Sequence, residues 1–341
     1  MSLEPVPGLD HPRLSRWFAT SLPSLGAVTG ATLVAGGRSN LTYRIDLEGG
    51  SVALRRPPLG HVLPTAHDMV REHRVLSALA RHGNVPVPAP LALCTDDQVL
   101  GATFYVMDWV DGRIVRTLED ASDIAPEQAA GLSERLAEAL AAIHLLDVDA
   151  AGLTDFGRPD GYMARQLKRW GQQWERSKTR ELPAYDQLVK RLADGLPESS
   201  RTTLVHGDFR LDNALVRLEP APEIAAVVDW EMSTLGDPLA DLGLTLVYWT
   251  EPEDEPLPVG STVTAAPGFP TRAGFTEHYA NLTGFDVSDL DYYVAFGCFK
   301  LAIILEGIHA RFLQNATVGE GFDGIGAAVP VLVDRAHTVL G

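Results

Sequence analysis

The sequence predicts an α+β fold in which a small antiparallel sheet with one main helix precedes a larger, mainly helical part. Residues of the first third alternate with a strand period between turn residues, whereas apolar residues from about Gly112 onward recur at helical spacing. The 341 residues, 45% of them hydrophobic, divide more comfortably over two domains than one. We therefore expect an N-terminal lobe at residues 1–107, a hinge at 108–112 and a C-terminal lobe at 113–341.

In the N-terminal lobe, two strand-like segments at Leu41–Leu47 and Ser51–Arg55 flank a Glu48-Gly49-Gly50 turn and predict a hairpin. A helix is expected from about Thr65 to Arg81, ending where Gly83 can adopt the positive φ of a helix stop. Three prolines in NVPVPAP forbid its continuation. The apolar runs LALC and TFYVMDWV are typical of further antiparallel strands.

In the C-terminal lobe, residues 125–146 predict an amphipathic helix, and a second helix is expected near Tyr162–Ser177, where Trp170 and Trp174 more often indicate core than a binding surface. The segments TTLV, ALVRL and IAAVVDW read as strands, and from Asp237 the chain is again mostly helical. Asp237 followed by Pro238 is typical of a helix N-cap with proline in the first turn.

The distribution of charge argues against a nucleic-acid partner. Residues 1–107 carry nine arginines and eight acids, whereas residues 108–341 carry 19 basic and 37 acidic groups. The simplest interpretation of the acidic part is a solvated surface. The longest apolar stretch, GCFKLAIILEGI, is interrupted by Lys300 and Glu306, so no membrane span is expected. Without a secretory signal or a metal-ligand cysteine spacing, the chain is expected to be cytoplasmic. The expected oligomeric state is a monomer or homodimer.

The segment LVHGDFRLDNALV places a polar loop between two apolar runs. Asp208 and Asn213 lie on this loop, and Asp229 ends the apolar strand IAAVVD. An acid at the end of a buried strand must be neutral, paired or bound to a metal. An Asn and an Asp from neighbouring loops supply hard oxygen ligands suited to Mg²⁺, and a second Asp can accept a proton from a hydroxyl group. Phosphoryl transfer from ATP needs this division of roles.

The residues His206–Asn213, followed by Asp229-Trp230, resemble the catalytic loop and metal-binding motif of aminoglycoside phosphotransferase-type kinases, as does Gly236-Asp237-Pro238. The resemblance implies a bilobal, protein-kinase-like fold and a small-molecule hydroxyl group as phosphoryl acceptor. It also implies ATP or GTP and Mg²⁺ as cofactors. Asp208 is then the catalytic base or hydroxyl-orienting residue, Asn213 and Asp229 bind Mg²⁺, and His206 is structural.

The strand Ser51–Arg55 resembles the kinase strand that offers a lysine to the nucleotide phosphates, with arginine in its place. Alternation puts Ala53 and Arg55 on one face and turns Arg56 to the other. No lysine occurs before Lys168, so Arg55 is the candidate cation. Glu72 falls on the apolar stripe of the expected helix and needs a cationic partner, which Arg55 can supply.

Further nucleotide contacts are expected at the glycine-containing loop before the hairpin and at the connector between the lobes. The loop could instead be an ordinary glycine turn. With Ala53, Arg55 and Glu72, the residues assigned to the nucleotide are Gly37, Ser39, Asn40, Met107, Asp108, Trp109 and Val110.

Three functions compete. A small-molecule kinase fits best, a catalytically weak nucleotide-binding module is the alternative, and a metallophosphoesterase is disfavoured because only His206, of ten histidines, adjoins an acidic motif. Stretches such as VALRRPPLGHVLPTAHDMVREHRVL and LDYYVAFGCFKLAIILEGIHAR are similar to kinase-like domains fused to acyl-CoA dehydrogenases. That similarity suggests a hydroxyacyl compound or another metabolite as substrate, rather than an aminoglycoside.

Overall fold

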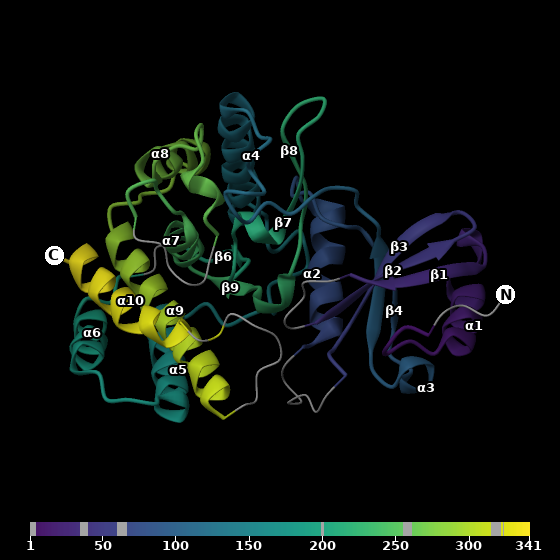
Figure 1. Cartoon of the computed structure of the whole chain (residues 1–341), viewed down its shortest axis with the longest axis horizontal. Coiled ribbons are helices and arrows are strands. Elements are labelled where there is room, and N and C mark those ends of the chain that lie inside the picture. Colours follow the sequence, from purple (N-terminus) through teal and green to yellow (C-terminus); the bar gives the residue numbers. More distant parts are fainter. Residues whose placement is uncertain are drawn as a thin grey trace.

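A computed structural model shows a five-stranded sheet at one end of the molecule and a larger helical part at the other (Figure 1). It describes residues 5–34, 40–59, 67–198, 201–254, 261–314, 322 and 324–341. Its two sets of elements are joined by the segment that follows Asp108, the last residue of the sheet. The predicted α+β class is confirmed.

The sheet is antiparallel throughout, with strand order β1-β2-β3-β5-β4. The predicted hairpin is confirmed, since Leu47 pairs with Gly50 across the Glu48-Gly49 turn. The elements of this part are α1 (His11–Ser21), η1 (Pro23–Leu25), β1 (Val28–Leu33), β2 (Leu41–Leu47), β3 (Gly50–Arg56), α2 (Met69–His82), β4 (Pro90–Cys94), α3 (Asp97–Leu100) and β5 (Phe104–Asp108).

Helix α2 begins after Asp68, whose side chain accepts a hydrogen bond from the Arg71 amide and caps the helix. The predicted start near Thr65 lies outside the described residues. The helix ends at Gly83, as expected, but the prediction of a positive φ is wrong. Gly83 is extended, with φ −105° and ψ 152°. Glycine is favoured there because a Cβ would lie 2.9 Å from the carbonyl oxygen of Leu79.

The helical part contains two short two-stranded sheets, and the polar loop connects one to the other. Strand β6 pairs with β9 and β7 pairs with β8, both antiparallel. Its elements are α4 (Pro126–His144), α5 (Tyr162–Ser177), α6 (Pro183–Asp194), β6 (Thr203–Val205), η2 (Leu211–Asn213), β7 (Ala214–Arg217), β8 (Glu223–Val227), η3 (Trp230–Met232), β9 (Thr234–Gly236), α7 (Pro238–Tyr248), η4 (Val263–Ala265), α8 (Arg272–Thr283), α9 (Leu290–Leu313) and α10 (Ile325–Val339).

Two hydrophobic cores result from the alternation of side chains on the sheet. Val52 and Leu54 face one core with α1, whereas Ala53 faces the other. This second core continues under α2 into the helical part, and α2 lies between the two parts in Figure 1. This second core therefore runs continuously from the sheet into the helical part.

Helix α9 occupies the centre of the helical part and packs against α5, α6, α7 and α10. Among the described helices it alone is long and apolar enough to cross a membrane, and 78% of its most apolar stretch is buried inside the fold. Burial of this extent is typical of a core helix.

Candidate active site

The segment His206–Asn213, here called the HGD loop, connects β6 to β7 and lies beside the end of β8. Its last three residues form the short turn η2. The backbone of Asn213 accepts a hydrogen bond from the amide of Val228 at 2.9 Å. Because Asp229 is the next residue after Val228, this contact brings the three predicted catalytic residues into one region.

Asp208 and Asn213 are joined directly. The Asn213 side-chain amide donates to the Asp208 carbonyl oxygen at 2.8 Å and to its carboxylate Oδ2 at 3.0 Å. Arg210 Nε lies 3.5 Å from the same oxygen. The Tyr248 phenol, whose pKa is raised by burial, also forms a side-chain hydrogen bond with Asp208. The Asp208 carboxylate is therefore held in a fixed orientation while its side chain is still 22% exposed.

Asp229 turns the chain out of strand β8 into η3. Its φ of 68° and ψ of 56° place it in the left-handed region, which is uncommon for a residue other than glycine. Its side chain is 32% exposed, and Arg55 Nη2 forms an ion pair with its Oδ1. This backbone conformation directs the acid towards the cation of β3.

Arg55 also binds Glu72 of α2, as the sequence predicts. Arg55 Nε lies 3.0 Å from one Glu72 carboxylate oxygen and 3.1 Å from the other. Burial, opposed by Arg55, raises the pKa of Glu72 to about 7, and the Tyr105 phenol is a further hydrogen-bond partner. Burial alone would lower the pKa of Arg55, but Glu72, Tyr105 and Asp229 together hold it above its ordinary value. Arg55 thus connects the sheet, α2 and the end of β8.

The donor atoms at Asn213 and Asp229 suit Mg²⁺. Because the Asn213 nitrogen is used by Asp208, its amide oxygen is the atom presented to a ligand, and Asp229 adds a carboxylate. Mg²⁺ is commonly held by one or two such protein oxygens, with phosphate oxygens and water completing its coordination. The described residues contain no group of three or more His, Cys, Asp or Glu side chains arranged to hold a metal.

The loop before β2 contributes one described residue. Asn40 is 2% exposed, and its side-chain nitrogen donates to Glu231 Oε2 at 2.9 Å, joining the sheet to the turn after Asp229. Its Oδ1 is buried and has no hydrogen-bond partner among the described residues. The predicted Gly37 and Ser39 lie outside the described residues.

The predicted nucleotide residues of the strands lie together. Ala53 of β3 pairs with Met107 of β5, and both are buried on the face towards α2. Beyond them, Asp108 is exposed, and the Trp109 indole donates to Asp111 at 2.9 Å with Arg44 over its ring. Val110 is half-buried. The face of the sheet towards α2 thus offers a small apolar wall that continues into the connector.

Sequence reasoning missed the residue that anchors the HGD loop, Asp241 of α7. Asp241 accepts hydrogen bonds from the backbone amides of His206 and, at 2.7 Å, Gly207, and it contacts His144 at 3.4 Å. Burial alone would raise its pKa, but the bond to His144, the charges of the two histidines and the Gly207 amide hold the pKa below its ordinary value. The available signal was an acid within the otherwise apolar helix Pro238–Tyr248.

His206 and Asp237 have structural contacts. His206 is fully buried, and its Nε2 lies 3.0 Å from the Val228 carbonyl oxygen. Asp237 caps α7 by accepting from the Leu239 amide at 3.0 Å, and it also accepts from the Tyr293 hydroxyl at 2.7 Å. Both residues therefore hold the elements around the HGD loop together.

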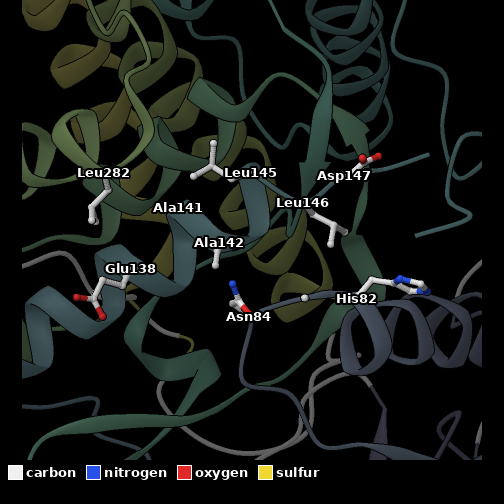
Figure 2. Close-up of a pocket in the computed structure, with 10 residues that line it drawn as sticks. His82, Asn84, Glu138, Ala141, Ala142, Leu145, Leu146, Asp147 and Leu282 are labelled. Atoms are coloured by element: carbon white, nitrogen blue, oxygen red, sulfur yellow. The ribbon is translucent and has the colours of Figure 1, made fainter. Parts of the chain in front are cut away.

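A separate hollow of about 330 Å³ lies where the end of α2 meets α4 and α8 (Figure 2). Its walls are mixed, with His82, Glu138 and Asp147 around alanine and leucine side chains. None of the predicted site residues lines it.

A sheet lobe whose Arg55 contacts Asp229, next to a loop that carries the paired Asp208 and Asn213, is the arrangement expected of a protein-kinase-like phosphotransferase. The chain belongs to the phosphotransferase enzyme family, a family of small-molecule kinases, whose model matches residues 30–275. It is 31% identical to a solved protein from Ralstonia eutropha that is provisionally named an aminoglycoside phosphotransferase, with a TM-score of 0.83 and coverage of 97% of this chain and 98% of that one.

Two further similarities extend this result. The chain is 38% identical over 283 residues to acyl-CoA dehydrogenase family member 10 of Mus musculus. The matched region covers 82% of this chain and only 26% of that protein. A spectinomycin phosphotransferase solved with ADP and spectinomycin covers 99% of each chain at 13% identity and a TM-score of 0.64, which shows the shared fold. The chain thus spans about a quarter of the length of the mouse relative.

Proposed function

We propose that the chain transfers the γ-phosphoryl group of Mg²⁺-bound ATP or GTP to a hydroxyl group of a small molecule. The observation that carries this proposal is the pairing of Asp208 with Asn213 beside Asp229 and Arg55. Residues 1–107 would bind the nucleotide, 108–112 would act as a hinge, and 113–341 would hold the acceptor.

In the proposed reaction, the acceptor oxygen attacks the γ-phosphorus and forms a new P–O bond. The bond from the γ-phosphorus to the bridging oxygen breaks, and the nucleoside diphosphate leaves with that oxygen. The proton of the acceptor hydroxyl passes to the carboxylate of Asp208, which Asn213 and Tyr248 orient. Asn213 and Asp229 would hold Mg²⁺, which neutralises charge on the phosphates when it is bound.

The nucleotide would lie against the inner face of the sheet. Arg55 is the candidate partner of its phosphates. Its guanidinium group contacts the predicted metal ligand Asp229, so it lies where the metal-bound phosphates would be. Glu72 would position Arg55, while Asn40 would cover the phosphates together with Gly37 and Ser39. The apolar wall of Ala53 and Met107, continued by Asp108, Trp109 and Val110, would contact the base.

The proposed acceptor is a hydroxyacyl compound or another metabolite with a free hydroxyl group. Its support is the similarity to a relative named as an acyl-CoA dehydrogenase family member. Aminoglycosides are the less favoured acceptors, and efficient phosphorylation of kanamycin-type compounds would contradict this choice. The cytoplasmic location and the monomeric or homodimeric state stay predictions.

The test is incubation of the chain with Mg²⁺ and γ-labelled ATP or GTP in a small-molecule extract, followed by mass spectrometry for labelled products. Asp208→Asn and Asp229→Asn variants serve as matched controls, because each keeps its side-chain size and loses its charge. A product made by the unaltered chain and lost by at least 100-fold in both variants supports the kinase, by analogy with the loss of other positioned catalytic groups.

A nucleotide-binding module without efficient transfer is the second candidate. The observation that favours it is the engagement of Arg55 with both Glu72 and Asp229, where the family strand normally offers a lysine. Nucleotide binding by calorimetry without any labelled product would support this candidate, and in that case Asp208→Asn would leave the binding constant unchanged.

A further inference from the structure

Lys300 is a charged residue in the middle of the most apolar long helix described, α9. The chain has four lysines, all in the described ranges, and Lys300 alone among them is buried, with 9% exposure. Burial lowers the pKa of its ammonium group. A buried cation is costly unless it is paired, so its contacts indicate what it is retained for.

The contact of Lys300 lies inside the HGD loop. Its Nζ donates to the carbonyl oxygen of Gly207 at 2.7 Å, directly before Asp208. The amide of the same glycine donates to Asp241 at 2.7 Å. Gly207 is thus held on one side by an anion of α7 and on the other by a cation of α9.

The backbone of Gly207 has little freedom to move between these two charges. Its φ is +86°, and a Cβ at this position would lie 2.7 Å from the carbonyl oxygen of Met232. A shift of this peptide would therefore be passed on to Asp208, the next residue. Positioning errors of about 1 Å at reacting groups can cost about 100-fold in rate.

The charge of Lys300 also helps to hold the HGD loop. Asp208 and Asp241 attract the ammonium group, Arg169 repels it, and the Trp170 ring of α5 lies 5.5 Å from Nζ. The neighbours of Lys300 thus include the carboxylate of the proposed base and the carboxylate that anchors the loop. In a buried environment such an interaction is screened little.

Glu306, six residues further along α9, provides an internal comparison. It is fully buried, but it accepts from the Thr179 amide at 2.6 Å and the Thr179 hydroxyl at 2.7 Å, and it lies 3.2 Å from Arg180. These contacts fix the connection between α5 and α6. The two buried charges of one helix therefore serve different places.

We propose that Lys300 is a positioning residue for phosphoryl transfer, which holds the Gly207 carbonyl and, through the attraction of its charge, the carboxylate of Asp208 at the acceptor hydroxyl. This inference rests on the proposed function, and it adds a residue of α9 to the machinery of the HGD loop. Lys300 acts through Asp208 and needs no contact with either substrate.

The test compares Lys300→Met, which removes donor and charge, with Lys300→Gln, which keeps a donor and removes the charge. Glu306→Gln is the matched control. We expect Lys300→Met to lower kcat by about 100-fold with the nucleotide KM changed less than about twofold. Amide hydrogen exchange in residues 206–211 should rise by about tenfold. Lys300→Gln should retain slow exchange but lose about tenfold in kcat, and Glu306→Gln should lower the midpoint of thermal unfolding with kcat preserved.

The proposal is overturned if Lys300→Met keeps both kcat and slow exchange, or if Glu306→Gln reproduces its loss of kcat. If Lys300→Met does not fold, the folded Lys300→Gln variant decides. A loss of about tenfold in kcat supports the proposal, and an unchanged kcat overturns it. If the unaltered chain transfers no phosphoryl group, the proposed function fails by itself. Amide exchange in residues 206–211 then still tests whether Lys300 holds the loop. Faster exchange in Lys300→Met supports this role, and unchanged exchange overturns it.

Discussion

The Arg55 side chain joins three parts of the molecule that are far apart in the sequence. Its guanidinium group contacts Glu72, 17 residues away, and Asp229, 174 residues away. A planar group with several N–H donors can serve two carboxylates at once, whereas a lysine ammonium is a compact point charge. Arginine at this position therefore links α2 to the end of β8 within the protein itself.

Glu72 should make the stability of the chain depend on pH. Its folded-state pKa of about 7 lies above the ordinary 4.5, so the folded chain retains a proton that the unfolded chain has already released between these values. Its contribution to stability is greatest below the ordinary pKa and falls as the pH rises through 7. We expect the unfolding free energy of the unaltered chain, minus that of Glu72→Gln, to fall from about pH 5 to about pH 8.

Chemical denaturation at several pH values checks this expectation. Glu127→Gln, at an exposed position in the first turn of α4, is the control and should give a constant difference. Parallel curves for the unaltered chain and Glu72→Gln would show that residue 72 does not take up a proton in this range.

At the scale of elements, the crossing of α7 and α9 positions both charges that hold the HGD loop. Asp241 comes from α7 and Lys300 from α9. Gly243 makes their close approach possible, since a Cβ there would lie 2.6 Å from the carbonyl oxygen of Tyr293. The separation of these helices is thus tied to the geometry of the site.

We predict that Gly243→Ala destabilises the chain by about 1–3 kcal/mol, because α7 must move away from α9. Helix propensity alone predicts the opposite sign, since alanine is the better helix former by about 1 kcal/mol. Gly171→Ala in α5 is the control: its Cβ would meet nothing within 4 Å, so it should stabilise by about 0.5–1 kcal/mol. Denaturant unfolding measures both, and a stabilised Gly243→Ala chain would contradict the role of the crossing.

Local patterns in the sequence predicted much of the element structure. The helix Tyr162–Ser177 has the expected bounds, and the acid on the apolar stripe of α2 correctly indicated the Arg55–Glu72 pair. The φ of Gly83 was predicted wrongly, because its conformation depends on the close approach of Leu79. The contacts of Asp241 and Lys300 were missed, because a residue pattern within one helix does not say which distant loop the helix will meet.

At the scale of the whole molecule, the continuous core couples the sheet to the helical part. Ala53, Tyr105 and Met107 of the sheet share this core with α2 and the helices beyond it. The contacts of α2 with β4, β5 and η3 show that this helix packs on both parts. The lobes therefore form two parts of one structural unit.

We predict that residues 1–112 do not fold stably when they are produced alone, because the inner face of the sheet and α2 would be exposed to water. The full chain should unfold in a single transition, with the same midpoint by far-ultraviolet circular dichroism and by tryptophan fluorescence. A well-dispersed NMR spectrum of the fragment, or two separate transitions of the full chain, would contradict this prediction.

The arginine of β3 also determines which reagents can modify the proposed nucleotide site. Nucleotide analogues that acylate an amine have no lysine side chain to attack before Lys168. Such reagents therefore cannot label the cation of β3, because it is the guanidinium group of Arg55. Lys300 is the buried lysine near the HGD loop, whereas Lys168 and Lys190 are exposed and Lys178 is partly so. Amine-directed surface coupling would therefore attach the chain through the helical part and leave the sheet free, apart from the chain terminus.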